Sequence, residues 1–313
     1  MNKLLVALAF MLSANLTFAC DYCNIFINIS PNDYRNSFGV YRHIRLMHGL
    51  YTPSGAVVLK HGSVENTSLL ANRKVDEIYR TYDIRGRFYI KDKWKTMVTL
   101  PIVDNSYRID GLDKYRVRGV GDPMIIQNYQ VYNTKHCADS VSNFSQRFSV
   151  GAGVKIPLGS IDKTYPYGKP NVDLQPGSGS WDFLAMAIYS VRYKKVGLMT
   201  NINVKYSTEN KEGFRYGNTM NFNANFFYMK EIKGVVLMPF AGTYIEKFNK
   251  DLQNGGLLND SGGATFFGNL GLKVYKGNFV LTAQYQKVLQ NKLEGDKQLF
   301  TLYRSTVGVI FNF

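Results

Sequence analysis

Three cysteines and four histidines are the side chains best suited to metal binding or nucleophilic catalysis in this 313-residue chain. Cys20 and Cys23 are two residues apart, a spacing that occurs in haem, redox and zinc motifs. No histidine follows them directly, and no second cysteine pair completes a tetrahedral zinc site. The sequence therefore predicts neither a metal nor a cofactor, and Cys137 leaves a disulfide as the other use for these thiols.

The histidines do not suggest a hydrolase. A catalytic triad needs a nucleophile and a histidine base that a third group orients. His43, His48, His61 and His136 show no local Ser-His-acid spacing. We therefore predict that the protein is not an enzyme and has no catalytic residue, and a membrane-embedded hydrolase is kept only as a less favoured alternative.

The N-terminus has the features of an export signal. Residues 1–19 contain the basic Lys3, an apolar run over 4–12 and the small residue Ala19, the three parts of a secretory signal peptide. Cys20 follows the cleavage point as in a bacterial lipoprotein, but Phe18 is bulky where a lipobox has a small residue. Ordinary cleavage and lipidation both remain open, and in either case the protein leaves the cytoplasm.

Composition narrows the class further. The formal net charge is +15, and the chain holds 22 tyrosines and 20 phenylalanines. Aromatic girdles at two lipid interfaces account for such an aromatic content. An exported chain meets no nucleic acid in its normal compartment, so the positive charge favours an anionic surface or solute.

The elements that would position these residues are strands. From residue 38 onward, twelve segments of about ten to sixteen residues alternate with a period of two, the pattern of a transmembrane β-barrel. The segment 196–207 is the clearest, with Leu198, Thr200 and Ile202 alternating with Asn201 and Asn203. The predicted strands are 38–48, 75–90, 93–103, 121–132, 145–156, 181–193, 196–207, 217–229, 234–247, 264–276, 278–289 and 298–313. The predicted fold is all-β, a single antiparallel transmembrane β-barrel of about 12 strands.

The connections between these segments alternate in length. Short lysine-containing turns at 91–93, 194–195, 230–234 and 276–278 alternate with long ones at 49–74, 104–120, 157–180 and 248–263. In such barrels short turns face the periplasm and long loops face outward. The expected domains are the signal peptide at 1–19, a periplasmic segment at 20–37 that is a possible plug of the lumen, and the barrel at 38–313. This arrangement places Cys23 and Cys137 at the same rim, where we predict a disulfide.

The alternation also assigns side chains to the barrel interior. The predicted lumen is basic and rich in amides, and its candidate solute-path residues are Arg85, Arg87, Lys155, Arg192, Asn203, Lys205, Asn223, Lys273 and Arg304. Such a wall lowers the barrier for an anionic or hydrogen-bonding solute. The competing interpretation is that Asp83 and Asp182 pair with nearby arginines and fill a narrow interior.

Three glycine-containing stretches bring a family into view. They are Arg118-Gly-Val-Gly-Asp-Pro123, Val150-Gly-Ala-Gly-Val-Lys-Ile-Pro-Leu-Gly159 and Gln175-Pro-Gly-Ser-Gly-Ser-Trp-Asp182. In order and spacing the chain resembles the family of outer-membrane transporters named for the meta pathway of phenol degradation. The resemblance covers about residues 75 to 313 and implies a transporter-like barrel. Apart from the family, Gly177 and Gly179 are residues that tolerate positive φ in a long loop.

The expected function is passive passage of a small solute through an outer-membrane β-barrel channel or transporter, porin-like, in a Gram-negative bacterium. The expected partners are outer-membrane lipid and lipopolysaccharide, the barrel assembly machinery and the small-molecule solute, with no nucleic acid. The assembly machinery would recognise the C-terminal strand, which ends at Phe313. The alternative is a non-transporting barrel that binds partners through its external loops.

Overall fold

The computed structural model describes residues 35–51, 73–91, 93–134, 143–166, 168–259, 261–293 and 300–313. The signal peptide and most of the predicted periplasmic segment lie outside the described residues. Within these ranges no helix is long and apolar enough to cross a membrane.

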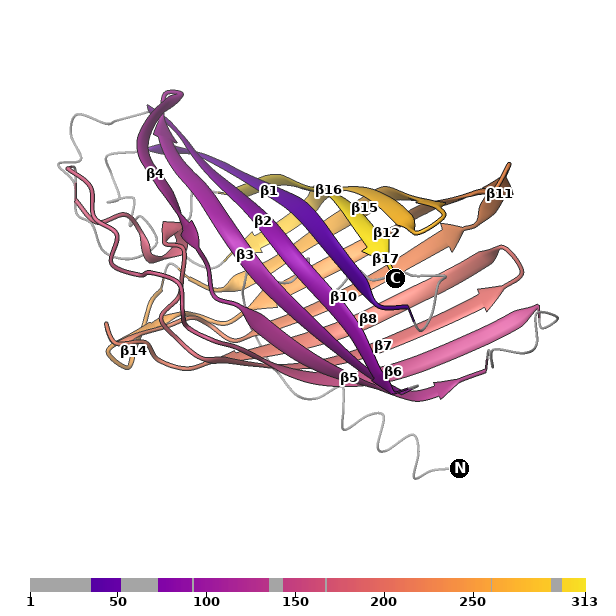
Figure 1. The fold of residues 1–313 in the computed structure, drawn as a ribbon. Coiled ribbons are helices and arrows are strands. Elements are labelled where there is room, and N and C mark those ends of the chain that lie inside the picture. Colours follow the sequence, from indigo (N-terminus) through magenta and orange to yellow (C-terminus); the bar gives the residue numbers. More distant parts are fainter. Residues whose placement is uncertain are drawn as a thin grey trace, which may run out of the picture.

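Twelve antiparallel strands close into one barrel (Figure 1). They are β1 (Ser37–Tyr51), β2 (Arg73–Lys91), β3 (Trp94–Ile109), β5 (Met124–Asn133), β6 (Phe144–Lys155), β7 (Asp182–Tyr193), β8 (Val196–Ser207), β10 (Thr219–Tyr228), β12 (Val235–Phe248), β15 (Gly263–Lys276), β16 (Phe279–Leu293) and β17 (Phe300–Asn312). Each pairs with its neighbour in this order, and β1 pairs with β17 to close the sheet. The predicted fold and strand number are confirmed.

Alternating burial follows from the sequence pattern. On β8, Asn201, Asn203 and Lys205 are buried, whereas Ile202 and Tyr206 are exposed on the outer face. Inward side chains on other strands show the same contrast with exposed apolar neighbours. The polar residues that the alternation assigned to the interior therefore face the lumen, and the apolar ones form the outer belt.

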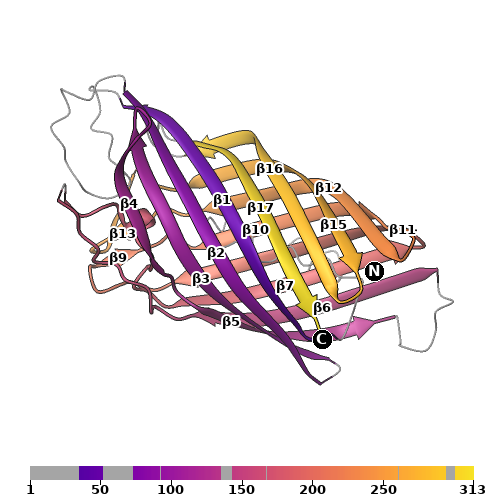
Figure 2. The same cartoon turned by 45° about the horizontal axis from the view of Figure 1, so that its top comes forward.

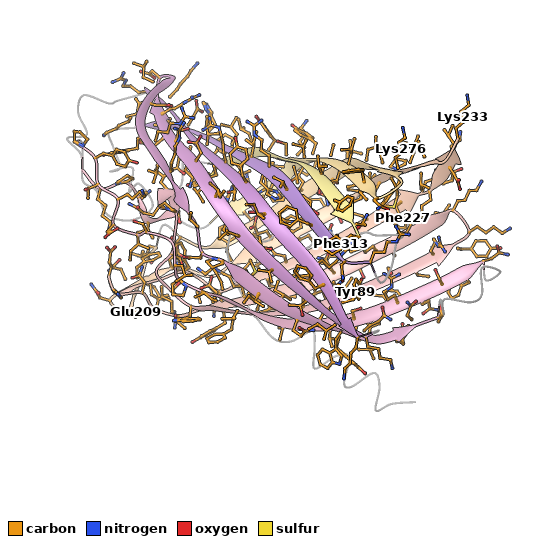
Figure 3. All side chains as sticks on the ribbon, in the orientation of Figure 1. Tyr89, Glu209, Phe227, Lys233, Lys276 and Phe313 are labelled. Atoms are coloured by element: carbon orange, nitrogen blue, oxygen red, sulfur yellow. The ribbon has the colours of Figure 1, made fainter. Side chains whose placement is uncertain are left out.

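The two ends of the barrel differ. Tight turns with positive φ at Lys194, Lys233 and Gly277 mark the short-turn end. The long connections 156–181, 208–218 and 249–262 mark the opposite, long-loop end. Figure 3 shows Lys233 and Lys276 at the first end and Glu209 at the second.

One predicted loop is partly wrong. Residues 104–120 were expected to form a long external loop, but β3 continues to Ile109 and pairs with β4 (Leu112–Val120). The resulting hairpin rises beyond the barrel at the long-loop end (Figure 1). Tyr107, Tyr115 and Val117 are buried on its inner side, packed with Leu174 of the short helix η3 (Val172–Leu174). The hairpin is therefore a folded extension of the barrel wall.

Four smaller strands complete the described structure. β9 (Phe214–Arg215), β13 (Leu252–Gln253) and β14 (Gly256–Leu257) form a three-stranded sheet in the long connections. β11 (Lys230–Ile232) pairs with β12 at the short-turn end. Figure 2 shows that these two groups lie at opposite ends of the barrel.

Candidate functional site

The three glycine-containing stretches meet at one buried ionic group at the long-loop end. Lys155, the last residue of β6, lies with its Nζ 2.9 Å from Asp182 Oδ2 and 3.1 Å from Asp122 Oδ2. Lys205 Nζ lies 3.2 Å from Asp182 Oδ2. The β6–β7 register sets Lys155 directly opposite Asp182, on the same inward face. We call Asp122, Lys155, Ser178, Asp182 and Lys205 the motif node.

The node holds the connection 156–181 in place. Asp122 accepts hydrogen bonds from the backbone amide of Gly159, the backbone amide of Ser178 and the Ser178 hydroxyl, each 2.8 Å long. Asn210 of the next long connection donates to the Ser178 carbonyl at 2.9 Å. All five side chains of the node are at most 7 % exposed. Hydrogen bonds and ion pairs of this kind satisfy charges that burial would otherwise make costly.

The glycines in these stretches permit close packing. A Cβ on Gly177 would lie 2.2 Å from the Gly159 carbonyl oxygen, so neither residue tolerates a side chain. Gly179 uses the tolerance of glycine for positive φ, with a φ of +69°. Gly177 does not have a positive φ, and its role is the close approach of two backbone segments.

A second polar group runs across the interior as an array of amides. Asn225 donates to Asn223 at 2.8 Å, Asn269 donates to Asn223 at 3.0 Å, and Gln286 donates to Asn269 at 2.8 Å. Asn225 and Asn269 belong to β10 and β15, which β12 separates. Gly242 of β12 stands between them in register and carries no side chain, so the amides can meet across it.

A third group combines charge with aromatic rings. Arg304 of β17 forms an ion pair with Glu246 of β12, on the far side of β16 and β15. Its guanidinium lies 4.6 Å from the Phe267 ring centroid and 5.9 Å from that of Tyr244. The Tyr244 hydroxyl donates to Asn221 at 2.8 Å, which connects this group to the amide-bearing strand β10.

The fourth group contains the buried His43. Its Nε2 lies 3.0 Å from Asp83 Oδ2 and its Nδ1 lies 2.9 Å from the Thr306 hydroxyl. This chain of hydroxyl, imidazole and carboxylate has the composition of a catalytic triad, but Arg85 Nη2 lies 2.5 Å from the same Asp83 oxygen and 2.8 Å from His43 Nε2. A guanidinium can only donate, so it occupies the acceptors that a general base needs. The arrangement fits a structural ion pair.

The structure has features in favour of both interpretations of the interior, the basic solute path and the filled barrel. Asp83 pairs with Arg85 as the filled-barrel interpretation requires, whereas Asp182 pairs with lysines. Cations still outnumber carboxylates on the inward faces of the described strands. On the twelve barrel strands the cations are Arg45, Arg73, Arg85, Arg87, Lys95, Arg147, Lys155, Arg192, Lys205, Lys273 and Arg304, and the carboxylates are Glu77, Asp83, Asp182 and Glu246; Asp122 lies just before β5, and Glu231 lies on β11.

The predicted solute-path residues all lie on inward faces. Lys155 and Lys205 belong to the motif node, Asn223 to the amide array and Arg304 to the charged aromatic group. Arg85 lies beside His43, and Arg87 and Lys273 lie within electrostatic range of each other. Asn203 is 3 % exposed, and Arg192 of β7 approaches the Met229 sulfur at 3.9 Å. Contact of any of these residues with a solute stays a prediction.

Sequence reasoning did not single out Asp122, Ser178, His43 or Glu246 as members of interior groups. For Asp122 a signal was present, because it ends the Gly-x-Gly-Asp stretch. The predicted disulfide partners Cys23 and Cys137 lie outside the described residues. Among the residues that the structure describes, no group of three or more His, Cys, Asp or Glu could hold a metal ion.

Comparison with solved structures supports the fold. The chain is similar to an outer-membrane channel from Pseudomonas putida F1, with a TM-score of 0.63, 13% identity, and coverage of 91% of this chain and 100% of that one. The β domain of the Bordetella autotransporter BrkA matches at a TM-score of 0.45 with 10% identity over 90% of this chain and 100% of that one, too low to support an argument. A comparison with curated protein sequences gives no match.

The comparison with family models completes the assignment. A family model matches residues 75–294, more than two thirds of the chain, and these include the whole motif node. A closed barrel of twelve strands with an apolar outer belt and a polar interior is the architecture of bacterial outer-membrane proteins. The protein is a bacterial outer-membrane β-barrel, and it belongs to the family described as "Putative MetA-pathway of phenol degradation".

Proposed function

We propose that this barrel is an outer-membrane channel for the passive passage of a small solute, with a lumen that favours anionic and hydrogen-bonding molecules. The observation that carries the proposal is the polar wall, in which cations and amides occupy inward positions on most of the barrel strands. Cationic rings and hydrogen-bonding groups are the means by which pores lower the barrier for anions. The similar barrel from Pseudomonas putida is itself a channel by its description, which supports the proposal.

The described side chains also suggest a narrow path. Lys205 and Lys155 are 3 % and 2 % exposed, and the amide array is buried to a similar degree. A solute that passes along such a lumen exchanges its hydrogen bonds with water for hydrogen bonds with the amides and ion-paired side chains of the wall. We therefore expect a small unit conductance, well below that of the wide sixteen-stranded porins.

Planar-bilayer recording with the purified barrel tests the proposal. Under a KCl gradient we expect stepwise currents whose reversal potential indicates preference for chloride. The variant R87Q/K273Q removes two lumen cations and should shift the reversal potential toward that of a cation-selective pore. The control K287Q/K292Q removes two cations from the outer face of β16 and should leave it unchanged.

Two outcomes would contradict the proposal. One is a cation-selective current in the wild type. The other is absence of any current from protein that heat-modifiable gel mobility shows to be a folded barrel. The second result would favour the alternative in which the external loops bind partners.

A further inference from the structure

A cluster of arginines lies on the outer surface of the barrel wall, away from the lumen. Arg116 of β4 forms a two-pronged ion pair with Asp104 of β3, with N–O distances of 2.8 and 2.9 Å. Arg118 Nε lies 3.1 Å from the same carboxylate, and Arg80 of β2 donates to the Ser106 hydroxyl at 3.0 Å and to the Asp104 carbonyl at 3.5 Å. We call Arg80, Arg116 and Arg118 the outer arginine cluster.

The cluster has more positive charge and more donors than its partners use. A guanidinium carries five N–H donors, and the Asp104 carboxylate pairs with two of the three guanidiniums, whereas Arg80 reaches the Asp104 backbone carbonyl and the Ser106 hydroxyl. Arg118 makes a single ion pair within the described residues, through Nε, and its side chain is 63% exposed. The Arg116 side chain is 45% exposed. The cluster therefore presents unoccupied donors and a net positive charge to its surroundings.

Its position matches the border between lipid tails and headgroups. On the outer face, the side chains next to the cluster toward the short-turn end are apolar: Ile102 of β3 is 40% exposed and Val120 of β4 is 54% exposed. The Tyr82 ring lies beside them on β2, and the Arg42 guanidinium is 5.9 Å from its centroid. Tyrosine and arginine together are typical of a membrane interface. The cluster lies just beyond it, where the hairpin of β3 and β4 leaves the barrel wall (Figure 1).

The platform behind the cluster is firmly packed. On the opposite side of the hairpin, Tyr107 and Tyr115 belong to a buried core that includes Leu174. The Tyr165 hydroxyl donates to the Arg116 carbonyl at 2.8 Å, and Asn105 donates to the Leu174 carbonyl at 3.2 Å. Guanidiniums on a fixed backbone lose less conformational entropy when they bind a ligand.

We infer that the outer arginine cluster binds the phosphate groups of the glycolipid that forms the outer leaflet, the lipid A part of lipopolysaccharide. The long-loop end faces that leaflet, and arginine forks match phosphate oxygens in pairs. The acyl chains of the bound lipid would lie along Ile102 and Val120, whereas Asp104 holds Arg116 and Arg118 in place without cancelling their combined charge. This site lies on the lipid-facing surface and is independent of any solute path.

Binding of lipid A to purified, lipopolysaccharide-free barrel in detergent tests the inference. We expect native mass spectrometry to show diphosphoryl lipid A retained on the wild type. The variant R80Q/R116Q/R118Q should bind it about tenfold or more weakly, a loss of about 1.4 kcal/mol or more, because it removes the charge-assisted contacts with the phosphates. A matched control, K247Q/K287Q/K292Q, removes three cations from the outer face of β12 and β16 near the same end and should bind as the wild type does.

Further arms separate phosphate recognition from other causes. Dephosphorylated lipid A should bind the wild type as weakly as diphosphoryl lipid A binds the glutamine variant, and inorganic phosphate should not displace the lipid at equal concentration. The variant R80K/R116K/R118K keeps the charge and should recover part of the affinity, which excludes misfolding as the cause. The inference would be overturned if the glutamine variant bound diphosphoryl lipid A as tightly as the wild type does, or if the wild type bound dephosphorylated and diphosphoryl lipid A equally.

Discussion

The motif node predicts strong energetic coupling between Asp122 and Lys155. Asp122 lies 3.1 Å from Lys155 and accepts three hydrogen bonds from the connection 156–181, and both side chains are at most 2 % exposed. K155M removes the lysine that faces the buried Asp122 carboxylate, and loss of the partner of a buried charge costs about 3–5 kcal/mol. In D122N, Lys155 keeps its ion pair with Asp182 at 2.9 Å. We therefore expect K155M to lower the free energy of unfolding by about 3–5 kcal/mol and D122N to lower it by less, about 1–3 kcal/mol.

The double variant should cost less than the two single ones together. D122N/K155M removes one charge of each sign, and Asp182 keeps its ion pair with Lys205 at 3.2 Å. The coupling energy, which is the sum of the single effects minus the double effect, should be about 1–3 kcal/mol. Urea unfolding from phospholipid vesicles, followed by the fluorescence of the two tryptophans, measures all four proteins.

An exposed pair at the same end is the control. Lys169 and Glu212 form an ion pair with side chains that are 35% and 38% exposed. Because solvent screens such pairs, the coupling between K169M and E212Q should not exceed about 1 kcal/mol. A coupling below about 0.5 kcal/mol in the buried pair, or an equal coupling in the exposed pair, would refute the idea that the node is a cooperative ionic unit.

Two further predictions concern the barrel wall and the hairpin tip. G242A should lower the free energy of unfolding by about 3 kcal/mol or more, because its Cβ would lie 2.0 Å from a backbone oxygen of β10. G268A on β15 should change this free energy by less than about 1 kcal/mol, because the nearest neighbour of its Cβ is a flexible leucine side chain at 3.3 Å. Similar urea midpoints for the two variants would contradict this prediction. The Arg73 side chain and the Lys74 amide hydrogen-bond to Asp110 and lower its pKa, so this stabilisation is complete above the usual aspartate pKa and lost as pH falls through the lowered value. The protection factor of the Lys74 amide, which compares its exchange rate with the intrinsic rate at the same pH, should fall in acid, and D110N should show the lower protection factor at neutral pH.

The barrel could be predicted from the sequence because alternation is a local property. In a strand that faces lipid on one side and polar groups on the other, the alternation in the sequence marks where the strand begins and ends, as in β8 from Val196 to Ser207. β4 escaped prediction although it alternates equally well, with Tyr115 and Val117 inward and Arg116 and Arg118 outward. Its outward residues are basic because it rises beyond the apolar belt, so the expected apolar outer face is missing.

The interior groups could be predicted only in part. Inward direction follows from the period of two, and the pairing of β6 with β7 sets Lys155 opposite Asp182, at the two ends of the long connection 156–181. The contact of Asp122 with Ser178 depends on how a long connection folds back over the barrel end, and no local pattern encodes that path. The pairing of Arg304 with Glu246 spans two intervening strands and depends on barrel curvature.

The barrel closes where β1 pairs with β17, and this closure brings the first and last strands together, so the chain could be rejoined there and opened elsewhere. The Phe313 amide donates to the Asn36 carbonyl at 2.9 Å, so the last residue lies beside the residue that precedes β1. A short covalent link between these two positions would bridge native neighbours, and a new opening at the Lys194–Lys195 turn would remove no strand pairing. The order of strands along the gene is thus separable from their order around the barrel, and a circular permutant of this kind can report whether assembly requires the aromatic residue at the free end.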